Sequence, residues 1–227
     1  MSVHDGHRQR MKKRFLEYGA DGFDDHNLLE LLLFFALPRV DTNRTAHELL
    51  ERFGSIDAVL EATGDELMAS PGVGENAAVL LKLVPALARR YLTAKNSVGS
   101  ILASTEDAGR FLLPRFLGRR DETVLLVCLD TKMKAVSCRP IASGDVSAAH
   151  ISVRKVVEQA LAQNAPFVLL AHNHVNGLAL PSAEDVATTR RLQEALALVG
   201  VTLVDHIVVA GDDFVSLKEN GVLEHGE

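Results

Sequence analysis

Tryptophan is absent from this chain of 227 residues, and aromatic residues of all kinds make up only 5% of it. The hydrophobic residues, 47% of the chain, are therefore mostly aliphatic, and the cores that they form must be aliphatic as well. Charged residues at 24% complete a composition that is ordinary for a soluble globular protein. A chain of this length can hold one large domain or two modest ones.

Cysteine is scarce as well, with only Cys128 and Cys138 in the chain. They flank a predicted hairpin turn at residues 131–133, so they are candidates for cross-strand neighbours. Two cysteines do not make a disulfide framework. We therefore expect free, buried thiols in a reducing compartment.

Long hydrophobic runs are missing too. The longest, at residues 28–37, contains Glu30 and is too short to span a bilayer. Residues 1–14 are polar and basic and lack the apolar segment of a secretory signal, so we expect a soluble, cytoplasmic protein. The formal net charge of −6 argues against a protein that coats nucleic acid by bulk electrostatics, but a local basic patch remains compatible with it.

The first hundred residues show only helical periodicity. The predicted helices cover residues 6–18, 26–37, 42–54, 55–60, 64–67 and 74–92. Asp25 is the expected cap of the second helix and Pro38 its stop. The small, polar stretch 94–100 predicts a linker. We therefore place an all-α domain at residues 1–95 and a second domain at residues 104–227.

From residue 104 onward, strands and helices mix. The strand-like runs are 123–129, 135–142, 167–171, 201–210 and 214–217, and the helical ones are 104–113, 152–163 and 182–199. Pro114 is expected to interrupt the first of these helices. Because strands and helices do not alternate strictly, the pattern predicts a three-layer α/β domain around a mixed sheet.

A histidine-rich segment stands at the end of the apolar run 166–170. His172 and His174 are one residue apart, and residues i and i+2 of a strand share a face, so both imidazoles can converge on one point. Asp185 follows at the start of a predicted helix. Two nitrogens, one oxygen and an open fourth position form the ligand set of a catalytic zinc. The alternative is a polar strand end that binds nothing.

Hydrolysis at such a site also requires a general base and a donor for the developing oxyanion. Glu122, at the mouth of the first strand, is the candidate base, with Asp121 as its rival and a solvated strand-end charge as the alternative. Ser182 can supply a hydroxyl beside the metal, and it can also cap the helix that begins there. Asp205 and His206 are either a pair that orients a ligand or an ordinary hydrogen-bonded pair.

The spacing His172-x-His174, seven residues, Ser182, two residues, Asp185, with an upstream glutamate, resembles the JAMM (MPN-plus) metalloprotease motif. The segments 170–174, 181–185 and 203–207 look like the RadC family of bacterial proteins, and residues 6–8, 41–43 and 71–74 resemble its helical N-terminal part. The resemblance implies an MPN-type α/β fold with Zn²⁺ held by His172, His174 and Asp185. It also implies that Glu122 is the general base and that Ser182 stabilises a tetrahedral intermediate.

The chain departs from the family pattern at two places. Val175-Asn176-Gly177 stand where the family usually has Pro-Ser-Gly, so a proline that would stiffen the loop is missing. Residues 153–155 read Val-Arg-Lys where the family has Pro-Arg-Glu, so only Arg154 is kept. Neither departure removes a ligand.

Residues 71–74, Pro-Gly-Val-Gly, and the apolar helix after them resemble a helix-hairpin-helix element. Gly72 and Gly74 would let backbone amides face a DNA phosphate, and Lys82 would add positive charge. The alternative is a tight corner between helices, and Glu75 stands where a basic residue would help DNA binding. The basic cluster at residues 7–14 supports a nucleic-acid or acidic partner, or is a solvated helix face.

The leading prediction is thus a zinc-dependent hydrolase that cleaves a peptide or isopeptide amide in a protein or peptide substrate. One alternative is a DNA-binding accessory protein of DNA repair or recombination that uses the helix-hairpin-helix. Another is a metal-dependent nuclease. The same two-nitrogen, one-oxygen ligand set accepts other divalent ions as well as zinc. No membrane partner is expected, and the oligomeric state leaves no mark in the sequence.

Overall fold

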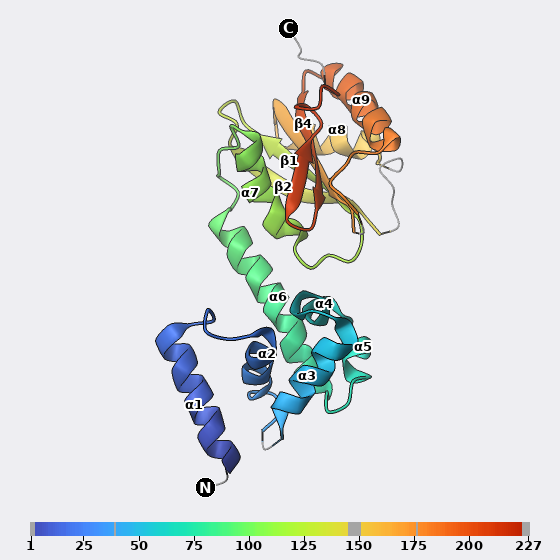
Figure 1. Ribbon diagram of the computed structural model, residues 1–227. Coiled ribbons are helices and arrows are strands. Elements are labelled where there is room, and N and C mark those ends of the chain that lie inside the picture. The colour runs from blue at the N-terminus through green and yellow to red at the C-terminus, as the bar shows by residue number, and fades with distance from the viewer. Residues whose placement is uncertain (1–2, 39, 145–150, 176, 224–227) are drawn as a thin grey trace. The chain divides into compact units, whose positions relative to one another are not determined.

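The computed structural model describes residues 3–38, 40–144, 151–175 and 177–223 (Figure 1). The chain divides into two compact units, Met1–Ala88 and Arg89–Glu227. This division falls inside a long helix, upstream of the predicted linker. Within the described ranges, no helix is both long and apolar enough to cross a membrane.

The N-terminal unit consists of helices, most of which pack around an aliphatic core. They are α1 (Val3–Tyr18), α2 (Asp25–Leu33), α3 (Thr42–Phe53), α4 (Ile56–Glu61), α5 (Gly64–Met68) and α6 (Glu75–Lys95), the last of which continues into the C-terminal unit. Leu49 and Leu81 are among the fully buried side chains of this core. The predicted helix end at residue 54 and helix start at residue 55 are confirmed: Gly54 ends α3 with a φ of +92°, and the Ser55 side chain caps α4.

Helix α2 is shorter than the sequence predicted. A helix was expected over residues 26–37, but α2 ends at Leu33, and the turns that follow contain backbone bonds to carbonyls three residues back. The Arg8 guanidinium donates to three carbonyls of this following segment, and it thereby satisfies acceptors that the end of a helix leaves open. The N-cap position is Asp24 rather than Asp25.

A five-stranded mixed sheet is the frame of the C-terminal unit. Its strands are β1 (Thr123–Leu129), β2 (Ala135–Ser143), β3 (Phe167–Asn173), β4 (Thr202–Ala210) and β5 (Asp213–Ser216), and its further helices are α7 (Thr105–Phe116), α8 (Val153–Ala162) and α9 (Ala183–Ala197). The strand order is β2-β1-β3-β4-β5, with β3 and β4 parallel and the other neighbours antiparallel. Helix α9 lies in the connection between the two parallel strands, which need such a crossover.

Helices cover both faces of this sheet (Figure 1). On the face of α8 and α9, Leu170 of β3 and Leu192 of α9 share a core. On the face of α7, Phe111 packs with Leu169. Because side chains alternate along a strand, His172 is on the α9 face. The predicted three-layer α/β arrangement is confirmed, and each strand begins and ends within two residues of its predicted run.

The prediction that Pro114 interrupts a helix was wrong, because α7 runs past it to Phe116. Proline lacks the N–H that would bond to the carbonyl four residues earlier, so the helix gives up one backbone bond there. In the same turn the Arg115 guanidinium donates to the Phe111 carbonyl.

The cysteines are free thiols, as predicted. The register of the β1–β2 pair sets Cys138 opposite Val127 and Cys128 opposite Ser137. The two thiols are therefore on opposite faces of the sheet, and no disulfide can join them there.

Candidate metal centre

Strand β3 and its continuation carry the two histidines. The Nε2 atoms of His172 and His174 lie 3.0 Å apart, so the predicted convergence of the imidazoles is confirmed. The backbone N–H of His174 donates to the Val209 carbonyl, which keeps this residue aligned with β4 beyond the end of the strand. His172 is buried, at 3% exposed, and His174 is half-buried.

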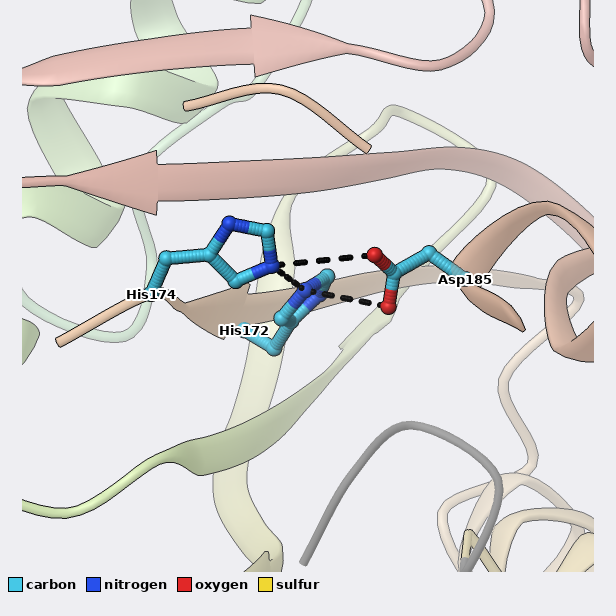
Figure 2. Close-up of side chains that lie close together, drawn as sticks. All are labelled: His172, His174 and Asp185. Carbon is cyan, nitrogen blue, oxygen red and sulfur yellow. Dashed lines mark hydrogen bonds and ion pairs between the residues drawn. The ribbon is translucent and has the colours of Figure 1, made fainter. Parts of the chain in front are cut away.

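Asp185 completes the group from the first turn of α9 (Figure 2), and it is 2% exposed. Its Oδ1 lies 3.2 Å from His172 Nε2, and its Oδ2 lies 3.6 Å from His174 Nε2. Two ligand atoms bound to one tetrahedral zinc at the usual bond lengths stand about 3.3 Å apart. The separations lie near that value, although the 3.2 and 3.6 Å distances run to different Asp185 oxygens. The three side chains are therefore spaced so that they could supply three ligand atoms to one ion, which leaves a fourth tetrahedral position. In the part of the chain that the structure describes, they form the group of His, Cys, Asp or Glu side chains suited to hold a metal.

Ser182 holds the Asp185 carboxylate in place. It is the N-cap of α9, and its Oγ accepts the Asp185 N–H at 3.1 Å. In return, Asp185 Oδ2 accepts from the Ser182 N–H at 2.7 Å and from its hydroxyl at 2.6 Å. The predicted helix cap is confirmed as a reciprocal capping box. The Ser182 hydroxyl hydrogen is used on Asp185 here, so any donation to an oxyanion requires Ser182 to exchange this bond.

The electrostatics suit metal binding. Burial raises the pKa of Asp185, but the attraction of the His172 ring when that ring is protonated, together with the hydrogen bonds from Ser182, outweighs burial and holds the pKa below its ordinary value. The carboxylate is therefore ionised at neutral pH, as a metal ligand must be. His206, behind the centre, behaves differently: burial first, and repulsion from His172 second, lower the pKa of His206 well below its ordinary value.

Both candidate histidine ligands have the other ring nitrogen engaged. His172 Nδ1 lies 2.8 Å from Nε2 of His206 in β4. His174 Nδ1 lies 3.2 Å from the Leu178 carbonyl, and because a carbonyl carries no hydrogen, the ring N–H donates. Partners of this kind fix the orientation of metal-binding imidazoles. Among the loop positions that depart from the family pattern, Asn176 lies outside the described residues.

The predicted Asp205-His206 pair divides between two roles. His206 contacts His172, as an orienting residue would. Asp205 instead accepts from the Ser216 hydroxyl at 2.6 Å and from the Lys218 N–H at 3.0 Å, and so it fastens the end of β5. Neighbouring residues on a strand point to opposite faces, which explains the division.

Thr189 is a residue that the sequence analysis missed. It is fully buried, and its hydroxyl lies 2.6 Å from Nδ1 of His206. Its spacing of four from Asp185 puts both residues on one face of α9, and this spacing was the available signal.

Glu122 directly precedes β1 and is half-buried. The β1–β3 ladder pairs Val124 with His172 in antiparallel register. Continuing that register by two residues sets Glu122 opposite His174, at the end of the sheet where the two histidines lie. Its role as general base stays a prediction.

Asn173, between the two histidines, was also missed. Its Oδ1 accepts the Thr123 N–H at 2.8 Å, and its Nδ2 donates to the Asp121 carbonyl at 3.2 Å. The amide therefore ties the segment around Glu122 to the end of β3. Asp121, the rival base, is exposed.

The predicted helix-hairpin-helix element corresponds to α5, the turn at residues 70–74 and α6. Gly72 has a φ of +77°, and a Cβ there would lie 3.1 Å from Thr45 Oγ1, so the turn requires glycine. Gly74 stands directly before α6. The Lys82 ammonium donates to two carbonyls at the C-terminal end of α4, at 2.9 and 3.1 Å. Lys82 thus stabilises a helix end, and DNA contact by these residues stays a prediction.

Comparison with known proteins places the chain in a family. The family model described as the RadC-like JAB domain matches residues 102–222. The chain is 36% identical over 215 residues to a UPF0758 protein of Cellvibrio japonicus, covering 95% of this chain and 96% of that one. It is also 36% identical over 212 residues to a UPF0758 protein of Bordetella parapertussis (93% and 94%) and 35% identical over 225 residues to one of Stenotrophomonas maltophilia (98% and 96%). These names state no activity, but match and coverage together show that the chain belongs to the RadC family.

Proposed function

We propose that this protein is a zinc-dependent hydrolase that cleaves a peptide or isopeptide amide. The observation that carries the proposal is the convergence of His172 Nε2, His174 Nε2 and the Asp185 carboxylate, with separations of 3.0 to 3.6 Å. A divalent ion held there would supply Lewis acidity, which lowers the pKa of a water and polarises a carbonyl.

The ligand types favour zinc over the hard cations. Mg²⁺ and Ca²⁺ are bound mainly by oxygen, whereas zinc accepts imidazole nitrogen and carboxylate oxygen together. One carboxylate and two neutral imidazoles would leave a net positive charge at the centre, which suits the stabilisation of an oxyanion. The open fourth position is the mark of a catalytic site rather than a structural one.

Glu122 and Ser182 are the proposed acting groups. Glu122 accepts a proton from the attacking water and passes it to the leaving amine. Its half-buried position and the β1–β3 register, which sets it opposite His174, support this role. Ser182 donates to the oxyanion after it exchanges its bond to Asp185.

The DNA-binding alternative has weaker support. Two helices, α5 and α6, flank the glycine-containing turn, but the Lys82 ammonium is bonded to the end of α4. The net charge of −6 adds no attraction for phosphates. We therefore include DNA as a second substrate class in the test of the hydrolase proposal.

The test compares zinc-loaded wild type with Glu122→Gln and, as a matched control, Asp121→Asn. Each is incubated with a library of peptides and isopeptide-linked peptides, and new termini are identified by mass spectrometry. Single-stranded and branched DNA form a parallel arm. Wild type and Asp121→Asn should cleave amides, whereas Glu122→Gln should keep its zinc and lose roughly 10²–10⁴-fold in rate, the usual contribution of a general base.

Other outcomes contradict the proposal in distinct ways. Loss of cleavage in Asp121→Asn alone would move the base to Asp121. Metal-dependent cleavage of DNA without cleavage of amides would make the protein a nuclease. Wild type that binds zinc and cleaves neither substrate class would remove the hydrolase assignment.

A further inference from the structure

A series of buried hydrogen bonds links His172 to His206, His206 to Thr189 and Thr189 back to Asp185; we call it the relay. His172 Nδ1 lies 2.8 Å from His206 Nε2, and His206 Nδ1 lies 2.6 Å from Thr189 Oγ1. Thr189 Oγ1 in turn lies 2.6 Å from the backbone carbonyl oxygen of Asp185. Thr189 and His206 are both 0% exposed. The relay therefore joins β3, β4 and α9, and it begins and ends on candidate ligands.

The direction of each hydrogen bond follows from the chemistry of its last member. The Asp185 carbonyl can only accept, so the Thr189 hydroxyl donates its single hydrogen to it. Toward His206, Thr189 Oγ1 then has only lone pairs, so it can accept a hydrogen bond but cannot donate one. Nδ1 of His206 must carry the hydrogen and donate to that oxygen.

The second half of the argument rests on burial. The His206 ring contacts a hydroxyl and an imidazole, and no carboxylate is among its hydrogen-bond partners in the described part of the chain. A fully buried cation without such a partner is costly, so the ring is neutral and carries one hydrogen, which is on Nδ1. His206 Nε2 then has a lone pair and accepts from Nδ1–H of His172.

We infer that Thr189 and His206 are positioning residues that fix His172 in its Nδ1–H tautomer, so that the Nε2 lone pair faces His174 and Asp185. Because Thr189 also binds the Asp185 backbone, the same relay sets the spacing of two candidate ligands. The consequence for metal affinity rests on the proposed function, whereas the tautomer of His172 does not.

An intrahelical bond from threonine to the carbonyl four residues back is common and would not by itself indicate a role. What distinguishes Thr189 is that its oxygen also accepts from a buried imidazole bonded to a candidate ligand. Partners of this kind change metal affinity by about 10–100-fold when they are removed.

The first test reads the tautomers without any metal. Chelator-treated wild type labelled with ¹⁵N-histidine is examined by long-range ¹H–¹⁵N correlation at about pH 8, where ordinary imidazoles are neutral. We expect His172 and His206 to be in the Nδ1–H form. An Nε2–H form of His172, or a doubly protonated His206, would overturn the inference.

The second test uses a matched pair of variants. Thr189→Val keeps the shape of the side chain and removes the hydroxyl, whereas Thr189→Ser keeps the hydroxyl. Zinc affinity measured by competition with a chelator should fall about 10–100-fold in Thr189→Val and stay close to wild type in Thr189→Ser. Equal affinities in the two variants would refute the relay. Circular dichroism confirms that each variant is folded, and the wild-type spectrum decides the tautomer even where Thr189→Val does not fold.

The two proposals fail separately. If wild type binds no zinc, the ligand role fails, and the predicted effect of the relay on affinity fails with it. If wild type binds zinc and His172 has the other tautomer, the relay fails and the metal centre stands.

Discussion

Each unit of the molecule contains a buried carboxylate next to a histidine, and the two groups are built in opposite ways. In the N-terminal unit, Glu30 is 3% exposed, and each of its oxygens meets a donor: His7 Nε2 at 2.9 Å and Asn43 Nδ2 at 3.0 Å. In the C-terminal unit, the Asp185 oxygens face two imidazole nitrogens whose rings are both already bonded through Nδ1.

The difference separates a structural polar group from a candidate metal centre. Around Glu30, the acceptors are matched by donors, so the group is complete without any further atom. Around Asp185, the Ser182 N–H and hydroxyl donate to Oδ2, and the two carboxylate oxygens also face Nε2 of His172 and of His174. With both rings in the Nδ1–H form, acceptor atoms from three residues converge there, which is unfavourable unless a cation lies between them. A histidine beside a buried acid is therefore weak evidence for a metal, and the convergence of several acceptors is strong evidence.

The largest expected effect is on zinc affinity, and it should follow the loss of the Asp185 charge but not the loss of the Glu30 charge. Asp185→Asn should weaken zinc binding by more than about 100-fold, since it alters a ligand rather than a neighbour of one. Glu30→Gln should leave zinc affinity unchanged. Isothermal titration of both variants with zinc checks this contrast, and a similar loss of affinity in the two variants would remove the distinction between the groups.

A smaller effect is expected on the stability of the N-terminal unit. Glu30→Ala leaves the donors of His7 and Asn43 without an acceptor, so the free energy of unfolding should fall by about 1–3 kcal/mol. Chemical denaturation followed by circular dichroism measures it. In the double variant with His7→Ala the two losses should be less than additive because the side chains interact. Full additivity would contradict the proposed pairing.

The smallest effect is a pH dependence in the C-terminal unit. Burial, and repulsion from His172 after it, keep the pKa of folded His206 well below the ordinary value of 6.5, which the unfolded chain retains. Below that pH the unfolded state binds a proton that the folded state does not, so stability is fully present above pH 6.5 and falls as the pH decreases. The slope contributed by one such group is at most about 1.4 kcal/mol per pH unit.

Chelator-treated wild type and His206→Gln should therefore differ in the pH dependence of unfolding between about pH 7.5 and 5.5. The difference between the two proteins cancels the contribution of other groups, such as Asp205, whose pKa burial raises. Parallel pH profiles would show that His206 is not held neutral in the folded protein.

Much of the fold followed from local patterns. Strand-like runs located every described strand, and the expected cap Ser182 located the start of α9. The end of α2 was misjudged because Arg8, distant in sequence, satisfies the carbonyls that follow Leu33. The passage of α7 through Pro114 also depends on packing that no local pattern reports.

In the candidate site as well, some features followed from local spacing and others depend on tertiary contacts. The spacing of His172 and His174 on a strand predicted their convergence, which the structure confirms. His206 was singled out by its position on a strand, but its contact with His172 depends on the parallel pairing of β3 and β4, which sequence spacing does not specify. Thr189 gave no chemical signal of its own, since a threonine inside a helix is ordinary.

The most direct measurement is the zinc content of purified protein after dialysis, by elemental mass spectrometry, in wild type, His172→Ala and His7→Ala. We expect close to one equivalent in wild type and in His7→Ala and almost none in His172→Ala, because His172 faces other candidate ligands, whereas His7 faces the carboxylate of Glu30, whose other oxygen is bonded to Asn43. Wild type that holds no metal even after zinc is added, or His172→Ala that keeps its zinc, would contradict the metal centre.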